Sequence, residues 1–429
     1  MNLPPSANAD GGKFIMERAK TLDTHIPILD GKNIVLGVTG GIAAYKSADL
    51  ASRLVKAGAV VDVVMTAAAT EFVRPLTFQA LTHRPVALDM FSLLQETEIG
   101  HVSLGRRAAL MIIAPATANT IANLAHGLAD SLLATTALAC RGLILIAPAM
   151  ESGMWDNAAT TDNMEILRRR GFHVVGPEPG RLASGGYGQG RMSEPEALLD
   201  AARWLLGRSG PLAGRSVVVT AGGTREAIDP VRFIGNRSSG KMGWALALAA
   251  RDRGAEVTLI HGPTALQTPL GVADVAVESA EQMTTAVLEA TLAADALIMA
   301  AAVADYRPPA PAGQKIKKQS ENLRLELART ADILAAVAER RSRSGRPRVV
   351  VGFAAETQDV VANAREKLTR KGLSLIVAND VSAADSGFEV ETNRVTLLDA
   401  AGGMETLPLM SKAAAAEEVI DRVTGLLTG

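Results

Sequence analysis

The sequence is poor in cysteine, in aromatic residues and in net charge. Its one cysteine, Cys140, excludes an intrachain disulfide framework and a cysteine-rich metal site, which fits the reducing cytoplasm. The formal net charge of -1 provides no global field for nucleic acids or anionic membranes, so any phosphate must be bound locally. Aromatic residues make up only 3%, yet a hydrophobic content of 48% is enough for buried sheets and helices.

Long apolar runs are absent as well. Residues 1–30 mix proline, asparagine and charged residues without the continuous apolar stretch of a secretory signal, and we expect them to form a mobile extension. Runs such as 108–114 and 143–147 are much shorter than the ~18 residues that cross a bilayer. They predict buried strands and no membrane partner.

Two stretches of the chain open with the same pattern of an apolar strand, a glycine turn and a helix. Residues 31–41 lead into a helix at 47–57, and residues 214–223 lead toward a helix at 242–253. Strands that are apolar on both faces and alternate with helices indicate parallel sheets covered on both sides. The sequence therefore predicts an α/β protein with two doubly wound domains, Rossmann-like or flavodoxin-like, in tandem.

A stretch rich in glycine and proline separates the two patterns. We expect an extension, a first domain, a linker and a second domain at residues 1–30, 31–207, 208–213 and 214–429. Ligands of such sheets bind beyond the carboxyl ends of the strands, where helix N-termini offer N–H groups to phosphate. Each glycine turn thus predicts a phosphate-bearing ligand, although a tight turn also requires glycine for purely structural reasons.

Two common nucleotide motifs are excluded. Neither glycine turn has the Gly-x-Gly-x-x-Gly spacing, which argues against a tandem NAD-dependent dehydrogenase. Residues 235–242 match the P-loop spacing until Met242, which cannot ligate magnesium, and they lie well beyond the strand that a P-loop follows directly. This basic segment is expected to be an anion-binding loop of another kind.

The stretch from Asp229 to Gly243, DPVRFIGNRSSGKMG, resembles the signature of bacterial phosphopantothenate–cysteine ligases. Three more ligase-like segments follow in order, at 301–306, 315–318 and 352–357. The N-terminal half resembles the flavin-dependent phosphopantothenoylcysteine decarboxylases. From residue 31 onward, the chain is similar to the bifunctional enzymes of coenzyme A biosynthesis that fuse the two activities.

For the second half, the resemblance implies that CTP, together with Mg²⁺, converts the phosphopantothenate carboxylate to an acyl cytidylate, which the cysteine amine attacks. This chemistry requires cations and oriented donors where negative charge builds up on phosphates. Asn236 corresponds to the asparagine associated with the acyl cytidylate, and Lys315 to the lysine that contacts the triphosphate. No magnesium ligands are identified. The other implied CTP contacts are Asp305, Ala331, Asp332, Ile333, Leu334, Phe353, Lys367 and Lys371.

For the first half, the resemblance implies an FMN cofactor. Members of that family oxidise the cysteinyl thiol to a thioaldehyde, release the carboxylate as carbon dioxide and then reduce the enethiolate. His101 corresponds to the histidine required for the oxidative decarboxylation. The implied flavin contacts are Gly40, Gly41, Ile42, Ala43, Thr66, Pro115, Thr117 and Asn119. The implied substrate contacts are Asn119, Met150, Glu151, Met154 and Trp155.

Two positions of the first half depart from the family pattern. Glu151 replaces an asparagine of the substrate clamp, and an ionised carboxylate only accepts hydrogen bonds and repels the substrate carboxylate. Ser184 occupies the place of a cysteine that is often the catalytic proton donor in related enzymes, and a hydroxyl is a far weaker acid than a thiol.

Two hypotheses follow from these departures. In the first, decarboxylation persists, with Tyr187 or water as the donor and with Glu151 protonated or turned away. In the second, the first domain is a flavin-binding structural or regulatory partner of a working ligase. A pure scaffold protein is a third class, which is disfavoured by the lysine-rich segment 315–318 and the proline-rich cover 308–313 before it.

The expected partners are the small molecules 4'-phosphopantothenate, cysteine and CTP. The resemblance also implies a homo-oligomer, with trimeric contacts between the decarboxylase-like domains and dimeric contacts between the ligase-like domains.

Overall fold

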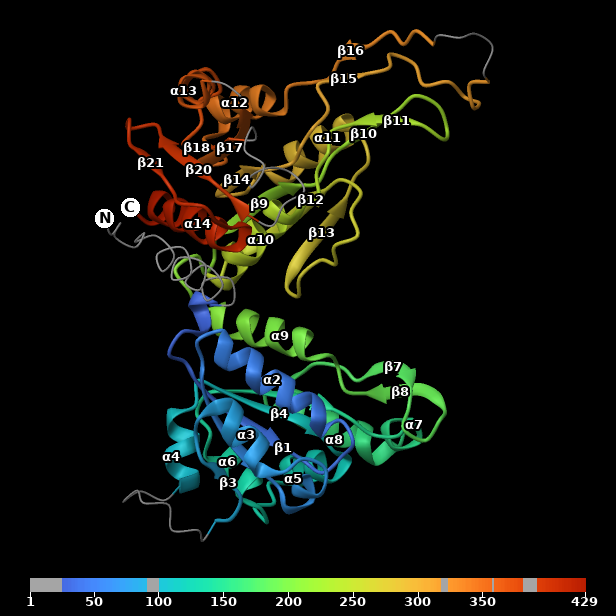
Figure 1. The fold of residues 1–429 in the computed structure, drawn as a ribbon, viewed down its shortest axis with the longest axis vertical. Helices are drawn as coiled ribbons and strands as arrows, with labels where there is room; N and C mark the ends of the chain where they lie inside the picture. Colours follow the sequence, from blue (N-terminus) through green and yellow to red (C-terminus); the bar gives the residue numbers. More distant parts are fainter. Residues whose placement is uncertain (1–24, 91–99, 318–322, 357–358, 381–391) are drawn as a thin grey trace, which may run out of the picture. The chain divides into compact units, whose positions relative to one another are not determined.

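A computed structural model describes residues 25–90, 100–317, 323–356, 359–380 and 392–429 of the chain. The chain forms two compact units, residues 24–206 and residues 207–429, and Figure 1 labels most of their helices and strands. Within the described residues, none of the helices combines the length and the apolar character of a bilayer-spanning segment.

The first unit is a six-stranded, all-parallel sheet with the order β3-β2-β1-β4-β5-β6 and a separate β7–β8 hairpin. Its strands are β1 Asn33–Val38, β2 Val60–Met65, β3 Val86–Ala87, β4 Leu110–Ala116, β5 Leu143–Pro148, β6 His173–Val174, β7 Glu178–Arg181 and β8 Tyr187–Arg191. Its α-helices are α2 Ala44–Lys56, α3 Pro75–Thr82, α4 Gly100–Arg107, α5 Ala118–His126, α6 Leu132–Ala139, α7 Ser152–Trp155, α8 Ala158–Arg169 and α9 Pro195–Gly207. Two short 3₁₀ segments are η1 Pro27–Leu29 and η2 Ala67–Glu71.

Alternate residues of each strand in this sheet pack into two different cores. Ile34 and Leu36 of β1 lie in one cluster with residues of α2 and α9, whereas Val35 lies in the other with residues of α4, α5, α6 and α8. Both strand faces are therefore buried, as the continuous apolar runs predict. Because β1 lies between β2 and β4, the chain leaves β1 and β4 toward opposite sides of the sheet, and a crevice opens at their carboxyl ends.

The second unit is an eight-stranded sheet with the order β13-β12-β9-β14-β17-β18-β20-β21. Its strands are β9 Ser216–Ala221, β10 Arg225–Ala227, β11 Phe233–Gly235, β12 Glu256–His261, β13 Val272–Ala276, β14 Ala296–Met299, β15 Tyr306–Arg307, β16 Ala328–Arg329, β17 Val349–Glu356, β18 Leu375–Asp380, β19 Thr392–Asn393, β20 Val395–Asp399, β21 Met404–Thr406 and β22 Met410–Ser411. Its helices are α10 Lys241–Asp252, α11 Ala280–Ala290, α12 Ile333–Ser344, α13 Val360–Arg370 and α14 Lys412–Thr428.

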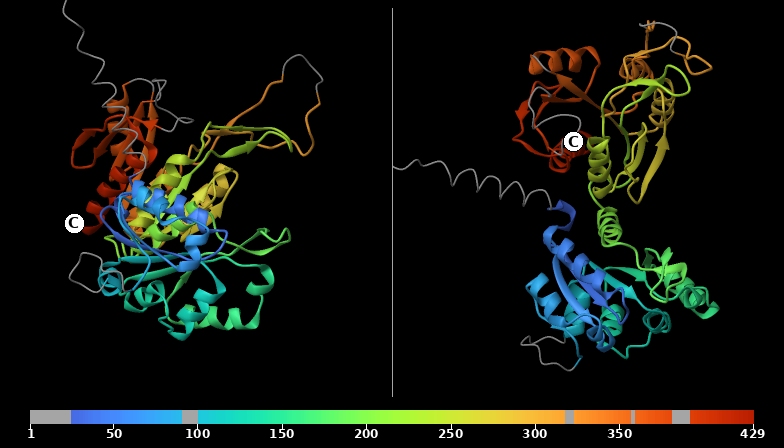
Figure 2. Two further views of the ribbon diagram at one scale, coloured as in Figure 1. Left: turned by 60° about the horizontal axis from the view of Figure 1, so that its bottom comes forward. Right: turned by 45° about the vertical axis from the view of Figure 1, so that its right-hand side comes forward.

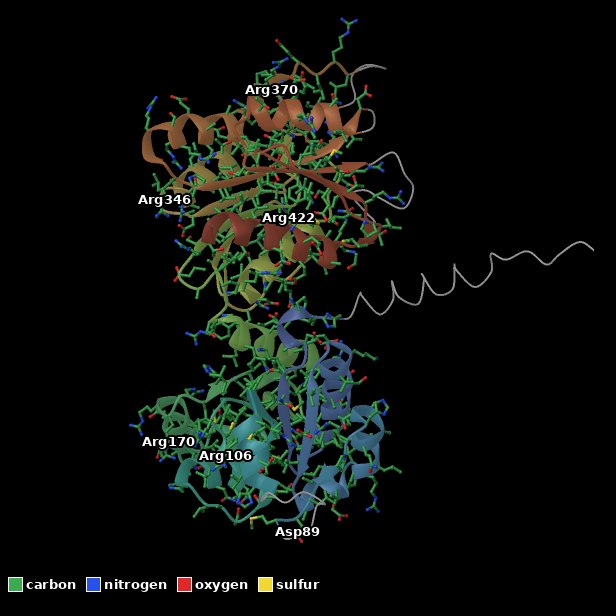
Figure 3. All side chains as sticks on the ribbon, turned by 90° about the vertical axis from the view of Figure 1, so that its left-hand side faces the viewer. Asp89, Arg106, Arg170, Arg346, Arg370 and Arg422 are labelled. Carbon is green, nitrogen blue, oxygen red and sulfur yellow. The ribbon has the colours of Figure 1, made fainter. Side chains whose placement is uncertain are left out.

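The second unit, like the first, has three layers, with helices on both faces of its sheet. Val217 and Val219 of β9 pack with α10 and α14, and Val218 packs with α11, α12 and α13. The two further views in Figure 2 show helices on both sides of each sheet, and Figure 3 shows side chains filling the space between the layers, with Arg346 and Arg370 at the edge of this unit.

The expectation of a wholly parallel second sheet needs a correction. Strands β18 and β20 run antiparallel, as do β20 and β21. The last two strands form a hairpin, and the Asp399 carboxylate stabilises its turn by accepting hydrogen bonds from the N–H groups of Ala401 and Gly403, both at 2.9 Å. A hairpin needs no crossover helix, so the alternation of strands and helices did not reveal it.

Two predicted boundaries also differ from the structure. Residues 1–24 of the expected extension lie outside the described residues, but 25–30 belong to the first unit, since Leu29 is fully buried in its core. Within the expected linker 208–213, Leu212 is fully buried in the core of the second unit. The predicted helices 47–57 and 242–253 are α2 and α10, which begin earlier, at Ala44 and Lys241. Helix α2 follows the glycine turn after β1, whereas the strands β10 and β11 separate α10 from the glycines after β9.

The helix α10 packs so closely on β9 that Gly243 cannot carry a side chain. A Cβ atom there would clash with the Cβ of Ala221 and lie 2.9 Å from its Cα. We expect Gly243→Ala to destabilise the protein by about 1–3 kcal/mol through overpacking.

A matched control is Gly425→Ala in α14, where an added Cβ meets nothing within 4 Å. Alanine should stabilise that helix by up to ~1 kcal/mol, because its helix propensity exceeds that of glycine. Urea unfolding followed by circular dichroism measures both. Equal shifts in the two variants would contradict the close packing of α10 on β9.

Candidate active site

The glycine turn after β1 forms one wall of the first candidate site. Gly40 approaches the η2 segment, where a Cβ atom would clash with the Cβ of Ala68 and lie 2.9 Å from its carbonyl carbon. Helix α2 then begins at Ala44, and no side chain caps its first turn. Within this turn the N–H of Ala44 donates to the carbonyl of Gly41 at 2.9 Å, and that of Lys46 donates to the carbonyl of Ala43 at 3.0 Å. The positive end of the helix dipole favours an anion here.

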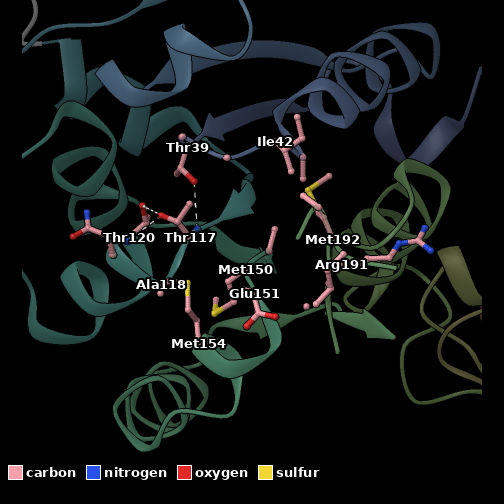
Figure 4. A pocket seen from close by; sticks show the side chains of 18 of the residues that line it. Thr39, Ile42, Thr117, Ala118, Thr120, Met150, Glu151, Met154, Arg191 and Met192 are labelled. Carbon is pink, nitrogen blue, oxygen red and sulfur yellow. Dashed lines mark hydrogen bonds between the residues drawn. The ribbon is translucent and has the colours of Figure 1, made fainter. Parts of the chain in front are cut away.

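The end of β4 forms the adjoining wall. The hydroxyl of Thr39 donates to the carbonyl oxygen of Pro115 at 2.7 Å and accepts from the N–H of Thr117 at 3.3 Å. Thr117 in turn caps α5 by accepting from the N–H of Thr120 at 3.4 Å. Figure 4 shows this network beside the cavity. It fixes the ends of β1 and β4 relative to each other at the crevice.

A cavity of ≈ 770 Å³ opens among the glycine turn, the start of α5 and the β7–β8 hairpin. Its volume falls within the ~300–1,000 Å³ that small-molecule sites occupy. The predicted residues that line it are Gly40, Gly41, Ile42, Ala43, Thr66, Thr117, Asn119, Met150, Glu151, Met154 and Ser184. The other lining residues are Thr39, Tyr45, Lys46, Ala68, Ala118, Thr120, Ala149, Arg181, Leu182, Ala183, Gly190, Arg191 and Met192.

Three predicted residues do not line this cavity. Pro115 is buried in β4 and contributes its carbonyl oxygen to the Thr39 network. Trp155 packs against the core cluster behind α7. His101 lies in the first turn of α4, where its Nδ1 atom is buried and has no hydrogen-bond partner among the described residues. Tyr187, the alternative proton donor, is 81% exposed and also lies outside the lining.

Glu151 is held by its own helix. Its Oε2 accepts from the N–H of Gly153 at 2.6 Å, and its Oε1 accepts from the hydroxyl of Ser152 at 2.9 Å. These hydrogen bonds, the one from Gly153 first, lower the pKa of Glu151 below its ordinary value. The residue at this clamp position is therefore an ionised cap of α7, and the idea that it is protonated at neutral pH is disfavoured.

Ser184 lines the cavity on the side of the β7–β8 hairpin, and no thiol lies beside it that could donate the proton in its place. The chain's single cysteine, Cys140, ends α6 and is not among the lining residues, and burial raises the pKa of its thiol. A thiol acid is therefore missing from this cavity.

The second candidate site forms where the loops after β9 and β14 meet. The Asn236 side chain donates to the carbonyl oxygen of Val303 at 2.9 Å. The N–H of Ala302 donates to the carbonyl of Gly222 at 2.8 Å, and that of Ala304 to the hydroxyl of Thr224 at 2.9 Å. Asn236 is thereby brought beside the segment that leads to Asp305, at the crevice of the second sheet.

Other predicted nucleotide contacts adjoin this crevice in two groups. The carbonyl of Asp305 accepts from the N–H of Thr330 at 3.0 Å, which sets Asp305 beside Ala331. Asp332 caps α12, which includes Ile333 and Leu334, and forms an ion pair with Lys371. In the second group, Lys367 donates to the carbonyl of Phe353 at 3.0 Å.

Lys315 is exposed. Its neighbour Ile316 is hydrogen-bonded to the buried carboxylate of Asp229, at the start of the signature stretch 229–243. Asp229 accepts hydrogen bonds from the N–H groups of Val231, Arg232 and Ile316 at 2.9, 2.9 and 3.1 Å. It also accepts from Nε of Arg232 at 3.0 Å, and these bonds, led by those of the Arg232 side chain, hold its pKa well below the usual range. No local pattern indicates this link, because it joins residues 87 positions apart. Lys318 and Thr357 of the ligase-like segments lie outside the described residues.

The described residues contain no group of three or more His, Cys, Asp or Glu side chains that could hold a metal ion. A second cavity of ≈ 420 Å³ opens beside the loop after β12. It is lined by His261, Gly262, Pro263, Ala276, Val277, Glu278 and Gln282, none of which the sequence had suggested.

Comparison with known proteins identifies both halves of the chain. Residues 26–206 match the family described as Flavoprotein, and residues 212–427 match the family described as DNA/pantothenate metabolism flavoprotein C-terminal domain. Among solved structures, the C-terminal domain of a coenzyme A biosynthesis bifunctional protein is 42% identical, with a TM-score of 0.43, and the match covers 51% of this chain and 98% of that one. A PPC decarboxylase complexed with pantothenoylaminoethenethiol is 31% identical, with a TM-score of 0.37, and the match covers 40% and 97%.

Full-length relatives are similar over nearly their whole length. The coenzyme A biosynthesis bifunctional protein CoaBC of Bacillus subtilis (strain 168) is 46% identical over 402 residues, which cover 93% of this chain and 98% of the relative. The protein of the same description from Vibrio cholerae is 48% identical over 394 residues, 91% of this chain and 98% of the relative. The chain belongs to the family of coenzyme A biosynthesis bifunctional proteins, as an enzyme with a flavoprotein decarboxylase domain followed by a ligase domain.

Proposed function

We propose that the chain catalyses two consecutive steps. The second domain joins 4'-phosphopantothenate to cysteine through an acyl cytidylate at the expense of CTP, and the first domain decarboxylates the product to 4'-phosphopantetheine with FMN. The observation that carries this proposal is that each domain gathers its candidate residues at the crevice of its sheet, around Gly40 and Thr117 in one and around Asn236 and Val303 in the other. The domain boundary would lie between residues 206 and 212.

In the ligase step, the protein neutralises the charge of the nucleotide phosphates and orients the acyl group. Lys315, Lys367 and Lys371 supply positive charge for the nucleotide phosphates, because charge that builds up during nucleotidyl transfer is stabilised by cations fixed in advance. Asn236, fixed on Val303, offers an amide that donates and accepts at the acyl group. The cysteine amine then attacks the activated carbonyl, an amide bond forms and CMP leaves.

In the decarboxylase step, the first domain binds and orients two ligands. The start of α2, at the positive end of its helix dipole, and the glycine turn before it fit the phosphate of FMN, which when bound would supply a reversible two-electron exchange with the substrate sulfur. Asn119 and Met150 line the same cavity, and we assign them to the substrate. Since Ser184 is a poor acid, we assign the final proton to water held near its hydroxyl.

Magnesium enters this proposal only with the nucleotide. No carboxylate cluster of the described residues fits a protein-held ion, and Mg²⁺ is commonly bound through substrate phosphates and a few waters. We place the enzyme in the cytoplasm, in agreement with its single cysteine.

We also propose that copies of the chain associate, as trimers through the first domain and as dimers through the second. Large apolar side chains are exposed around the flavin cavity, including Ile42 at 63% and Tyr45 at 62%. His101 is not in the cavity of its own chain, so a neighbouring copy would bring it there. Analytical ultracentrifugation of the full chain tests this, and a monomer would contradict it.

The proposed function predicts two separate activities of the purified protein. Pyrophosphate should be released from CTP only when both phosphopantothenate and cysteine are present. With FMN and phosphopantothenoylcysteine, carbon dioxide should form with 4'-phosphopantetheine as the product. No pyrophosphate would overturn the ligase assignment, and bound FMN without carbon dioxide would overturn the decarboxylase assignment. Accumulation of the enethiol would locate a defect at the proton transfer near Ser184.

The charge of Glu151 should weaken binding of the anionic substrate. Glu151→Gln keeps an acceptor for the N–H of Gly153 and removes the charge that repels the substrate carboxylate, so the KM for carbon dioxide release should fall about fivefold. Because the pKa of Glu151 is lowered, the difference from wild type should be constant from pH 6 to 8. A KM that rises in the variant would contradict the repulsion.

The Asp229 carboxylate should matter to the ligase alone. Asp229→Asn should lower the kcat/KM of pyrophosphate release at least about tenfold, because Ile316 beside Lys315 loses a charged acceptor, and carbon dioxide release should not change. Ionised Asp229 contributes stability that is fully present above its unfolded pKa of about 3.9 and is lost as the pH falls, so wild type and variant should converge in stability in acid.

The matched control for this prediction is Asp399→Asn. Asp399 also accepts two backbone N–H groups in a turn of the second domain, between β20 and β21, away from the candidate residues. An equal loss of ligase activity in both variants would show that Asp229 acts on stability rather than on the placement of Lys315.

A further inference from the structure

A buried lysine connects the flavin side of the cavity with its substrate side. Lys46 lies in the first turn of α2, directly after the glycine turn, and its side chain is only 9% exposed. Its ammonium group donates to the carbonyl oxygen of Met192 at 2.9 Å and to Oε1 of Glu194 at 2.8 Å. Both acceptors follow the β7–β8 hairpin, nearly 150 residues along the chain.

The same carboxylate oxygen also binds the hairpin itself. Nη2 of Arg191, the last residue of β8, donates to Oε1 of Glu194 at 2.8 Å. The hydrogen bond from Lys46 is the main cause that lowers the pKa of Glu194, with Arg191 contributing. The ionised Glu194 thus joins α2 to the end of the hairpin that carries Ser184.

A second contact holds the hairpin against the segment that bears Glu151. The N–H of Met150 donates to the carbonyl oxygen of Gly190 at 3.0 Å. A Cβ atom at Gly190 would collide with the carbonyl oxygen of Met150, so the two backbones are in direct contact. Of these two attachments, the one through Lys46 leads to the glycine turn.

Stability alone does not require a buried ammonium at this position. The Lys46 ammonium is buried, whereas its partner Glu194 is 47% exposed. An apolar side chain at position 46 would avoid the cost of removing an ammonium from water, so it would serve a purely structural role as well. Lys46 also lines the cavity, as do Gly41 and Ser184 on the elements that it joins.

We propose that the cluster Lys46–Glu194–Arg191 couples cofactor binding at the glycine turn to the placement of the Ser184 hairpin over the substrate, with Lys46 as a positioning residue. The inference rests on the proposed binding of FMN at this turn. A ligand that fixes the start of α2 fixes Lys46 and through it the hairpin. By linkage, an ordered hairpin must strengthen FMN binding by the same factor by which FMN favours the ordered hairpin.

Trypsin cleavage of the full-length protein after Arg181 measures the position of the hairpin. Arg181 is exposed and ends β7. In wild type, saturating FMN should slow cleavage at this bond by about fivefold or more, a typical allosteric coupling. In Lys46→Met the protein should still bind FMN, several-fold more weakly by flavin fluorescence, but FMN should no longer slow the cleavage. FMN should likewise fail to slow the cleavage in Glu194→Gln. In Lys46→Arg, FMN should again slow the cleavage as in wild type.

The control variant is Arg53→Gln on the same helix. Arg53 forms ion pairs with Asp49 and Glu196 at the surface, and the variant should keep full protection. If FMN protects Arg181 equally in wild type and in Lys46→Met, the ligand merely shields the bond and the coupling is overturned. Failure of wild type to bind FMN would instead overturn the proposed function of this domain.

Kinetics give a readout that a general loss of stability would not move. At saturating FMN, Lys46→Met should raise the KM for phosphopantothenoylcysteine at least about fivefold and change kcat less, because the hairpin is displaced before the substrate binds. Lys46→Arg should restore the KM. A lower kcat with an unchanged KM would contradict the positioning role.

Discussion

The architecture of both domains depends on one constraint, the reversal of strand order at the middle of each parallel sheet. Because the chain leaves β1 and β4 in opposite directions, and likewise β9 and β14, a crevice is left at the carboxyl ends of these strands. The turns that fill this space approach one another so closely that Gly40 has no room for a side chain. Backbone N–H groups and short polar side chains then become the walls of a ligand site.

The two domains use this constraint differently. In the first, the crevice is closed on a third side by the β7–β8 hairpin, and one cavity includes most of the residues assigned to the cofactor and the substrate. In the second, the candidate residues lie on several segments that hydrogen bonds and an ion pair hold together. Among the described residues, Lys315 is linked to these segments through its neighbour Ile316, whose N–H donates to Asp229. The same sheet topology thus supports an enclosed site and an open one.

Local patterns of the sequence were enough to predict most elements but not their long-range links. The strands β4 and β5 lie at the apolar runs 108–114 and 143–147 within a few residues, and α2 and α10 also differ from expectation by a few residues, because apolar runs and periodicity are local signals. The β20–β21 hairpin gave no such signal. Contacts such as Lys46 with Glu194 and Asp229 with Ile316 join residues far apart, and only the folded topology brings them together. The resemblance supplied the roles of Asn236 and Ser184, which their residue types alone do not indicate.

Asp229 has a consequence for the energetics of nucleotide binding. A carboxylate with hydrogen bonds from three backbone N–H groups and an arginine is an anion built into the fold, and it draws the start of the lysine segment toward the signature loop before any phosphate arrives. The start of that stretch therefore loses its conformational entropy when the protein folds, and this loss does not oppose nucleotide binding. A nucleotide that meets an already ordered segment keeps more of its interaction energy as affinity.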